Sequence, residues 1–368
     1  MKHRFLFCLA AALCLAACSS GKEEKVAVCI WHQIEGTPNL DSLRIEFQKW
    51  KGRGVTGVCI QTDSIEQIEP VAALAHAEGL EYHAWIPSML RKDMPHEWYA
   101  VNRLGQSADL YPAYSGTYRF LDPANPDVQE FLTRQYMKVA QLPSVDYVRL
   151  DFMRYPDVIL AKSLSEYYGL QDVKGEYAPA DYCYCERCVQ TFREQTDIDI
   201  TQVEDPSRVP QWAQFRCDQI TLFVDRITRA VHEAGKKVSV DVFPDPQSYA
   251  EKMVRQQWNQ WMVDMFFPMN YNDYYGEDPD WIGEVVKEEV EGAGNVPVMS
   301  ALRTTLQKNG PGEVNALNFG LTPAELKEAI LNSLANGAKG ICLYKPSRMN
   351  AQHWDALEEA LKEFGSSK

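Results

Sequence analysis

Short runs of apolar, often β-branched residues recur along the chain and alternate with longer segments in which apolar positions repeat every three to four residues. The short runs are typical of buried strands, and the longer period is typical of amphipathic helices. The pattern predicts eight strands, at residues 26–31, 55–61, 82–86, 147–152, 237–243, 263–270, 296–302 and 340–345. It predicts helices at residues 41–51, 64–78, 127–140, 211–234, 247–261, 280–291, 322–336 and 351–364.

Strands that alternate regularly with helices form parallel sheets, and eight such repeats are typical of the (β/α)8 or TIM barrel. We therefore expect the α/β class, with a single barrel over residues 26–368. The connections after the third and fourth strands, at residues 87–126 and 156–210, are unusually long. Because the loops that follow the strands build the active site of a barrel, we expect these enlarged loops to overhang it.

The first 17 residues combine a basic start with a short apolar run, a pattern that predicts a signal peptide. The run ends in LAAC, which resembles a bacterial lipobox with Cys18 as the lipidated first residue of the mature chain. Residues 18–25 are polar and form a short tether. We therefore expect a lipoprotein of the bacterial cell envelope, in the outer membrane, whose membrane contact is the lipid on Cys18.

The formal net charge is −14, with 37 basic and 51 acidic residues. Such acidity argues against nucleic acid as a partner, because nucleic-acid binding requires a basic surface. A hydrophobic content of 45% in a chain of this length supports a large core. The composition leaves the oligomeric state open.

The fourth predicted strand carries the sequence VDYVRLDFMRYP at residues 145–156, in which an apolar run ends in charged residues. Burying a carboxylate and a guanidinium at a strand end has a desolvation cost, so Asp151, Arg149 and Arg154 are candidates for chemistry. A structural ion pair is the alternative. Further candidates for substrate binding lie at or near the ends of other strands or follow this motif: Trp31, His83, Trp85, Tyr155, Asn270, Tyr271, Asp273, Tyr344 and Lys345.

A rim that combines carboxylates with aromatic rings suits a glycan, because rings pack on sugars and two carboxyl groups hydrolyse a glycosidic bond. We expect Asp151 to be the ionised nucleophile or base, with its pKa lowered by a neighbouring arginine. Asp241, in an apolar setting on the fifth strand, is the favoured general acid. Asp245 and Asp273 are alternatives, and a structural pairing of Asp241 with Arg149 stays open.

The fourth-strand motif resembles that of glycosyl-hydrolase-like family 10 and related bacterial barrels, as do LDPANPDV at residues 121–128 and the segment 263–272. The resemblance implies a glycosidase-type barrel, with peptidoglycan strands among the substrates known in the family. Tyr147 and Met269-Asn270 depart from the family pattern, so substrate contacts can differ. The pair Arg149 and Asp151 also resembles the α-amylase family 13, but no glutamate follows on the fifth strand.

The sequence CYCERC places Cys183, Cys185 and Cys188 in the long loop after the fourth strand, in an insert that the related barrels share. Outside the cytoplasm this spacing indicates either a structural zinc, with Cys217 as a fourth sulfur, or disulfides. Three other cysteines, at positions 29, 59 and 342, fall in apolar strands and are expected to be buried thiols. We expect no cofactor for catalysis.

The leading hypothesis is an envelope-anchored glycoside hydrolase that acts on a polysaccharide or a peptidoglycan-type glycan through a carboxylate pair. A surface lipoprotein that binds glycans without cleaving them is the alternative, because a fold does not imply activity. A metalloenzyme that uses His32, His83 and Asp151 is a weaker hypothesis, since isolated histidines on strands are more often structural.

Overall fold

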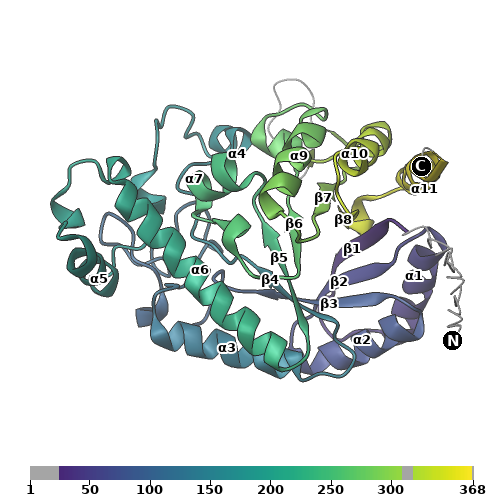
Figure 1. Ribbon diagram of the computed structural model, residues 1–368, viewed down its shortest axis with the longest axis horizontal. Coiled ribbons are helices and arrows are strands. Elements are labelled where there is room, and N and C mark those ends of the chain that lie inside the picture. The colour runs from purple at the N-terminus through teal and green to yellow at the C-terminus, as the bar shows by residue number, and fades with distance from the viewer. Residues whose placement is uncertain (1–24, 309–317, 367–368) are drawn as a thin grey trace, which may run out of the picture.

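A computed structural model describes residues 25–308 and 318–366, and its centre is a barrel of parallel strands surrounded by helices (Figure 1). The predicted TIM-barrel fold is confirmed, and all of the predicted strands are present with small shifts at their ends. The strands are β1 (Ala27–Gln33), β2 (Gly57–Gln61), β3 (Glu81–Pro87), β4 (Tyr147–Asp151), β5 (Lys237–Val242), β6 (Met265–Pro268), β7 (Met299–Arg303) and β8 (Gly340–Tyr344).

The strands are paired in the order β6-β5-β4-β3-β2-β1-β8-β7. Two isolated parallel bridges, Phe266 with Val298 and Met269 with Ala301, join β6 to β7 and complete the ring. Because all strands run in the same direction, their carboxyl ends lie on one rim of the barrel. Residues from distant parts of the sequence are thereby brought to a common site.

Helices cover the outside of the barrel and bury its apolar outer face. In Figure 1 the long helix α6 runs beside α3, and α5 lies in a segment that extends away from the barrel. The longer helices are α1 (Leu40–Gly52), α2 (Ile68–Ala77), α3 (Pro126–Ala140), α5 (Glu186–Thr196), α6 (Pro210–Glu233), α9 (Trp281–Ala293), α10 (Pro323–Ala335) and α11 (Ala351–Ser366). The short ones are α4 (Lys162–Tyr167), α7 (Lys252–Val254) and α8 (Asn272–Tyr275).

Two helices, α3 and α10, begin at well-defined caps. The Asn125 side chain accepts a hydrogen bond from the Asp127 backbone N–H at 3.0 Å, and proline occupies the first position of α3. Thr322 and Glu325 form a capping box at the start of α10. These caps satisfy backbone N–H groups that have no partner within the helix, so they fix where each helix starts.

The barrel interior holds a second, smaller apolar cluster. Cys29, Cys59 and Cys342 belong to it, and each is at most 2% exposed. The prediction that these three cysteines are buried thiols is confirmed. The interior is therefore a packed core below the rim, and any ligand must bind at the rim itself.

The structure corrects one predicted helix, at residues 247–261. The chain there forms a π-helical turn (Pro246–Glu251), the single turn α7 and then a 3-10 turn (Trp258–Gln260). Arg255 has a φ of 62°, in the left-handed region that ends a helix. Its buried guanidinium forms an ion pair with Glu176 from the segment after β4, so a tertiary contact interrupts the helical pattern.

The predicted signal peptide, Cys18 and the tether up to residue 24 lie outside the described residues. Within the described part of the chain, no helix combines the length and the apolar character that a membrane span requires.

Candidate active site

A cavity of about 300 Å³ opens at the carboxyl-terminal rim of the barrel. Its wall is mainly aromatic and comes from the ends of β1, β3, β4, β7 and β8, from the residues after β4, β5 and β6, and from the long connection between β3 and α3. The described residues that line it are Trp31, Gln33, Trp85, Tyr118, Asp151, Phe152, Arg154, Phe243, Met269, Tyr271, Tyr274, Tyr275, Arg303 and Tyr344.

Asp151 is the last residue of β4 and lies in the cavity wall, 5% exposed. Its carboxylate accepts hydrogen bonds from the Trp85 indole N–H at 2.8 Å and from the Phe152 backbone N–H at 2.7 Å. Burial raises the pKa of Asp151, and the two donors and the nearby Arg149 and Arg154 only partly offset this. The arginines lower this pKa as expected, but burial outweighs them, so the net shift is upward and the group favours its protonated form more than an ordinary aspartate does.

The backbone turns sharply directly after Asp151. Phe152 has a φ of 53°, which is unusual for a residue with a large side chain. At this turn the Phe152 N–H donates to the carboxylate of the preceding Asp151. Strained residues of this kind concentrate at functional sites, where the surrounding packing holds them in place.

Asp241 does not line the cavity. It forms a bidentate ion pair with Arg149 from the neighbouring strand, and both side chains are fully buried. The guanidinium also donates to the Cys59 sulfur at 2.8 Å and lies 3.7 Å from the ring centroid of Phe267. The favoured role of Asp241 as general acid is therefore not supported, because Arg149 binds both of its oxygens and its side chain does not line the cavity. The structural pairing that the sequence left open is the one observed.

Arg154 reaches the cavity from the segment after β4 and is held on two sides. It donates to an Asp157 carboxylate oxygen at 2.9 Å and to the Tyr118 hydroxyl at 3.0 Å, and Tyr118 also donates to Asp157. Arg154 was predicted, whereas Tyr118 and Asp157 were not. Asp157 directly follows the fourth-strand motif and could have been found there, but Tyr118 lies in a long loop that carries no pattern.

The aromatic rings of the wall contact one another. The Trp31 ring lies 4.9 Å from Trp85 and 5.2 Å from Tyr344, and Tyr271 stacks on Tyr344 at 6.4 Å between centroids. All four rings were predicted and are brought together. Tyr274 and Tyr275 were missed, although they directly follow the predicted Tyr271 and Asp273 in the sequence.

Several other predicted binding residues lie away from the cavity. His83 is buried lower in the barrel, where it bonds to Ser239 and stacks on Tyr147. Asn270 donates to Glu289 and to a serine of β7. Their positions near strand ends predicted that both residues lie at the rim. In the structure their side chains instead form hydrogen bonds with other buried polar groups.

Three more predicted residues stay outside the cavity wall. Tyr155 is buried in the core, 2% exposed. Asp273 accepts a hydrogen bond from the Gly320 backbone N–H at 2.9 Å, and so secures the connection after β7. The Lys345 ammonium group lies 5.8 Å from the centroid of the Tyr344 ring without lining the cavity.

Asp151 is the single carboxylate among the described residues that line the cavity. The expected pair of facing carboxylates is thus not found in this part of the chain. The loop alternatives, Asp245 and Asp273, do not line the cavity either, and the Asp245 carboxylate caps the turn that follows it. The described cavity wall can therefore offer one carboxyl group, the guanidinium groups of Arg154 and Arg303, and a set of aromatic rings, several of which carry hydroxyls.

One group of metal-ligating side chains is found among the described residues, and it lies outside the cavity. It consists of Cys183, Cys185, Cys188 and Asp122. Cys217, the expected fourth ligand, is buried on α6 and does not belong to it, because Asp122 occupies the fourth position. All cysteines in the described part of the chain are free thiols. The group also excludes His32, His83 and Asp151, so the metalloenzyme hypothesis gains no support.

Comparison with solved structures places the fold among glycosidase barrels. The endo-β-1,4-mannanase of Thermotoga petrophila has a TM-score of 0.54 at 8% identity, over 94% of this chain and 78% of its own. The class V chitinase of Pseudomonas fluorescens has a TM-score of 0.51 at 12% identity, and the match covers 91% of this chain and 99% of the chitinase. The α-galactosidase AgaA of Geobacillus stearothermophilus has a TM-score of 0.51 at 8% identity. The match covers 94% of this chain but only 42% of the α-galactosidase. At such identities the likeness shows the fold alone.

The sequence itself was compared with curated proteins and with family models. None of the curated proteins matches. The family model described as glycosyl hydrolase-like 10 matches residues 43–292, which is more than half of the chain and includes the fourth-strand motif and the cysteine group. The protein therefore belongs to the glycosyl hydrolase-like 10 family, as its motifs indicated.

Proposed function

We propose that the protein is a glycoside hydrolase of the bacterial cell envelope and that Asp151 is its general acid. The observation that carries the proposal is a buried carboxyl of raised pKa in an aromatic cavity at the carboxyl-terminal rim. A general acid must hold its proton near the working pH, and burial is the usual means of keeping a carboxyl protonated. Membership of a glycosyl hydrolase-like family supports the same reaction class.

In the proposed reaction the Asp151 carboxyl donates its proton to the glycosidic oxygen as the bond to the anomeric carbon breaks. Trp85, which donates to this carboxylate at 2.8 Å, stabilises the anion left behind. The rings of Trp31, Tyr271 and Tyr344 supply flat apolar surfaces for sugar rings. The buried Trp31 indole N–H has no hydrogen-bond partner among the described residues, so a substrate oxygen would satisfy it.

The single lining carboxylate bears on the choice of substrate. Most glycosidases need a second carboxylate, but in substrate-assisted enzymes a group of the substrate attacks the anomeric carbon instead. A sugar with a 2-acetamido group supplies such a group: its oxygen bonds to the anomeric carbon as the leaving sugar takes the Asp151 proton, and water then displaces it while returning a proton to Asp151. Peptidoglycan strands consist of sugars of this kind. We therefore propose a 2-acetamido glycan, with peptidoglycan-type strands as the leading substrate.

The activity is tested on the purified protein with denuded peptidoglycan strands, chitin oligosaccharides and a mannan, by measuring the release of reducing ends. We expect cleavage of glycans that carry 2-acetamido groups and none of the mannan. Asp151→Asn should abolish cleavage, whereas Asp41→Asn, at a side chain that is 94% exposed on α1, should leave it unchanged. Cleavage by Asp151→Asn at the wild-type rate would contradict the proposal.

A glycan-binding lipoprotein without catalysis is the second candidate. It is favoured by one observation, the lack of a second carboxylate among the described residues of the cavity wall. In that case the wild-type protein binds a glycan, measured by calorimetry, but releases no reducing ends. Asp151→Asn should then keep most of the affinity, because the ring surfaces remain.

The proposed location rests on the sequence of the first 25 residues. A basic and apolar leader followed by LAAC supports lipidation at Cys18 and attachment to the outer membrane. The test is fractionation of cells that produce the full chain, with a fatty-acid label. We expect a labelled protein in the membrane fraction, and an unlabelled protein when Cys18 is changed to alanine. Label that persists in the Cys18→Ala variant would overturn the assignment.

A further inference from the structure

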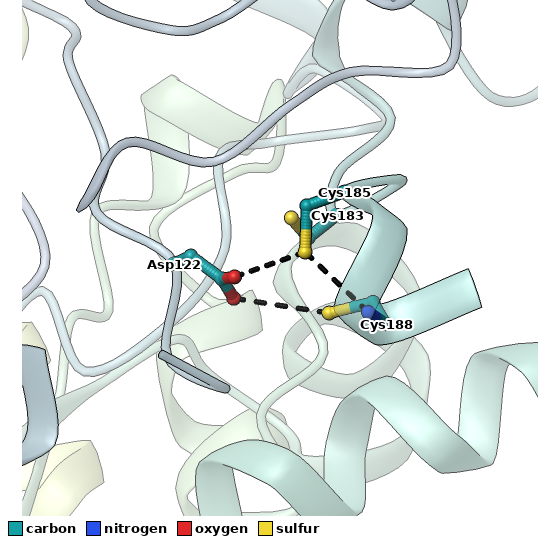
Figure 2. A group of neighbouring side chains, drawn as sticks. All are labelled: Asp122, Cys183, Cys185 and Cys188. Atoms are coloured by element: carbon teal, nitrogen blue, oxygen red, sulfur yellow. Dashed lines mark hydrogen bonds between the residues drawn. The ribbon is translucent and has the colours of Figure 1, made fainter. Parts of the chain in front are cut away.

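Four side chains from two separate segments of the chain converge, as Figure 2 shows, and none of them lines the cavity. Asp122 precedes α3, at the end of the connection that follows β3, whereas Cys183, Cys185 and Cys188 belong to the segment between β4 and α6. One ligand atom from each lies within 4.8 Å of the others. Asp122, Cys183 and Cys188 are at most 2% exposed, and Cys185 is half-buried.

The contacts within the group all involve sulfur or the carboxylate. The Cys185 thiol donates to one Asp122 oxygen at 3.1 Å, and the Cys188 thiol lies 3.8 Å from the other. Backbone N–H groups point at two of the sulfurs, from Val101 to Cys183 and from Cys188 to Cys185, each at 3.4 Å. N–H donors directed at sulfur are the outer contacts that orient a thiolate ligand.

A disulfide does not account for this arrangement. It would use two of the three sulfurs, and it would not explain why the third sulfur and the buried Asp122 carboxylate lie beside them. A cation uses all four groups at once. Around a tetrahedral zinc ion with Zn–S distances of about 2.3 Å, ligand atoms lie about 3.8 Å apart, so the observed group needs to contract by about 1 Å or less.

We propose that Asp122, Cys183, Cys185 and Cys188 bind one Zn²⁺ ion in a closed tetrahedral site. Thiolate ligands select zinc over magnesium and calcium, which prefer oxygen ligands. Four protein ligands leave no open position, so the ion is structural and takes no part in the reaction.

The surroundings suit a site with excess negative charge, because three thiolates and one carboxylate exceed the charge of the ion. Cys185 is the N-cap of α5, a helix of 11 residues, whose amino end favours negative charge. The Arg187 guanidinium lies 3.2 Å from an Asp122 oxygen. A hollow of about 450 Å³ is lined by Asp122, Cys185 and Arg187 and gives the ion a path from the solvent.

The site joins two loops that both contribute to the cavity. Tyr118, which contacts Arg154 in the cavity wall, lies four positions before Asp122 in the sequence. The cysteines lie in the segment after β4, which also carries Arg154. A zinc ion would therefore hold the loop after β3 to the segment after β4 and keep Tyr118 in position against Arg154.

The test is elemental analysis of the purified chain, without a polyhistidine tag, by inductively coupled plasma mass spectrometry. We expect one zinc ion per chain in the wild-type protein. Cys185→Ser should lose the zinc, whereas Asp122→Cys should keep it, because a fourth thiolate completes the same tetrahedron. Cys217→Ser is the matched control, a buried cysteine outside the group, and should keep its zinc.

A second measurement covers the case in which Cys185→Ser does not fold. Cobalt added to chelated, reduced wild-type protein should give the visible absorption of a tetrahedral thiolate site, and zinc should remove it. Folded wild-type protein without bound zinc that develops no such absorption would overturn the proposal, as would a disulfide found by alkylation among the three cysteines. Neither measurement involves a glycan, so the outcome is independent of the proposed activity.

Discussion

The ion pair between Arg149 and Asp241 allows a direct test of which aspartate acts on the substrate. Asp241→Asn keeps the shape of the side chain but leaves the Arg149 guanidinium buried without a counter-charge. Removing one partner of a buried pair costs about 3–5 kcal/mol, because the remaining charge stays desolvated. We therefore expect a large loss of stability, while the cavity wall, to which Asp241 does not contribute, is preserved.

The expected loss translates into a measurable shift of the melting temperature. The entropy of unfolding is about 2.1 cal/mol/K per residue, or about 0.7 kcal/mol/K for a chain of this size, so the midpoint should fall by about 4–7 °C. Differential scanning calorimetry measures the shift. Well below the lowered midpoint, kcat/KM should stay within about threefold of the wild-type value, since the loss of a general acid would cost about 10²–10⁴-fold.

A matched control is available in a second buried pair. Asp181 and Arg216 also form an ion pair of fully buried side chains, but they lie in the segment between β4 and α6 and in α6. Asp181→Asn should also destabilise the protein, by less because Glu176 lies 4.0 Å from the Arg216 guanidinium, and should leave activity unchanged. If Asp241→Asn instead keeps the wild-type melting temperature and abolishes cleavage, Asp241 acts on the substrate and the structural interpretation is wrong.

Three further predictions concern the cavity. Because burial raises the pKa of Asp151, kcat/KM should fall as the pH rises through that pKa. Trp85→Phe removes a hydrogen-bond donor to the carboxylate and should therefore move this decline to higher pH. A pH–rate profile that does not move would refute the link. Because the pKa of Asp151 is raised in the folded state, its contribution to stability is greatest below the ordinary aspartate pKa and is lost as the pH rises through the folded pKa. Asp151→Asn should therefore be at least as stable as wild type in urea unfolding at neutral pH. A clear loss of stability would argue against a cost of burying the carboxylate. Tyr271→Ala should weaken glycan binding about 2- to 10-fold in calorimetry, as expected for one lost ring contact, and an unchanged affinity would exclude this ring from the site.

The fold could be predicted because the strand signals are local. Each strand of the barrel is a short apolar run between helical segments, and this pattern does not depend on what the strand contacts. The helix expected at residues 247–261 failed for the opposite reason. Arg255 pairs with Glu176 from a distant segment, and nothing in the local pattern indicates that contact.

The site was predictable where a residue occupies a strand end and points into the barrel mouth. Trp85 and Asp151 meet that condition and form a hydrogen bond. His83, two residues before Trp85 on the same strand, points inward one layer lower, where it contacts Ser239. The sequence pattern gives which face a side chain occupies but not its height along the barrel.

The partner of a charged residue was the hardest feature to predict. Arg149 could pair with either of two aspartates, Asp151 or Asp241. Which of them it contacts depends on the register between neighbouring strands. Asp122 shows the same limit, since it replaces Cys217 next to the three cysteines through a loop contact across more than sixty positions in the sequence. Such pairings are set by tertiary geometry, which a single sequence does not reveal.

The closure of the barrel between β6 and β7 has a consequence for its motions. Neighbouring strands elsewhere pair over four or five consecutive residues, but this seam consists of two separate bridges, at Phe266 and Met269. Opening it breaks fewer hydrogen bonds, so amide protons there should exchange with solvent earlier than those of β1 to β4. Met269 also lines the cavity, so we expect this side of the cavity wall to loosen before the strand that carries Asp151.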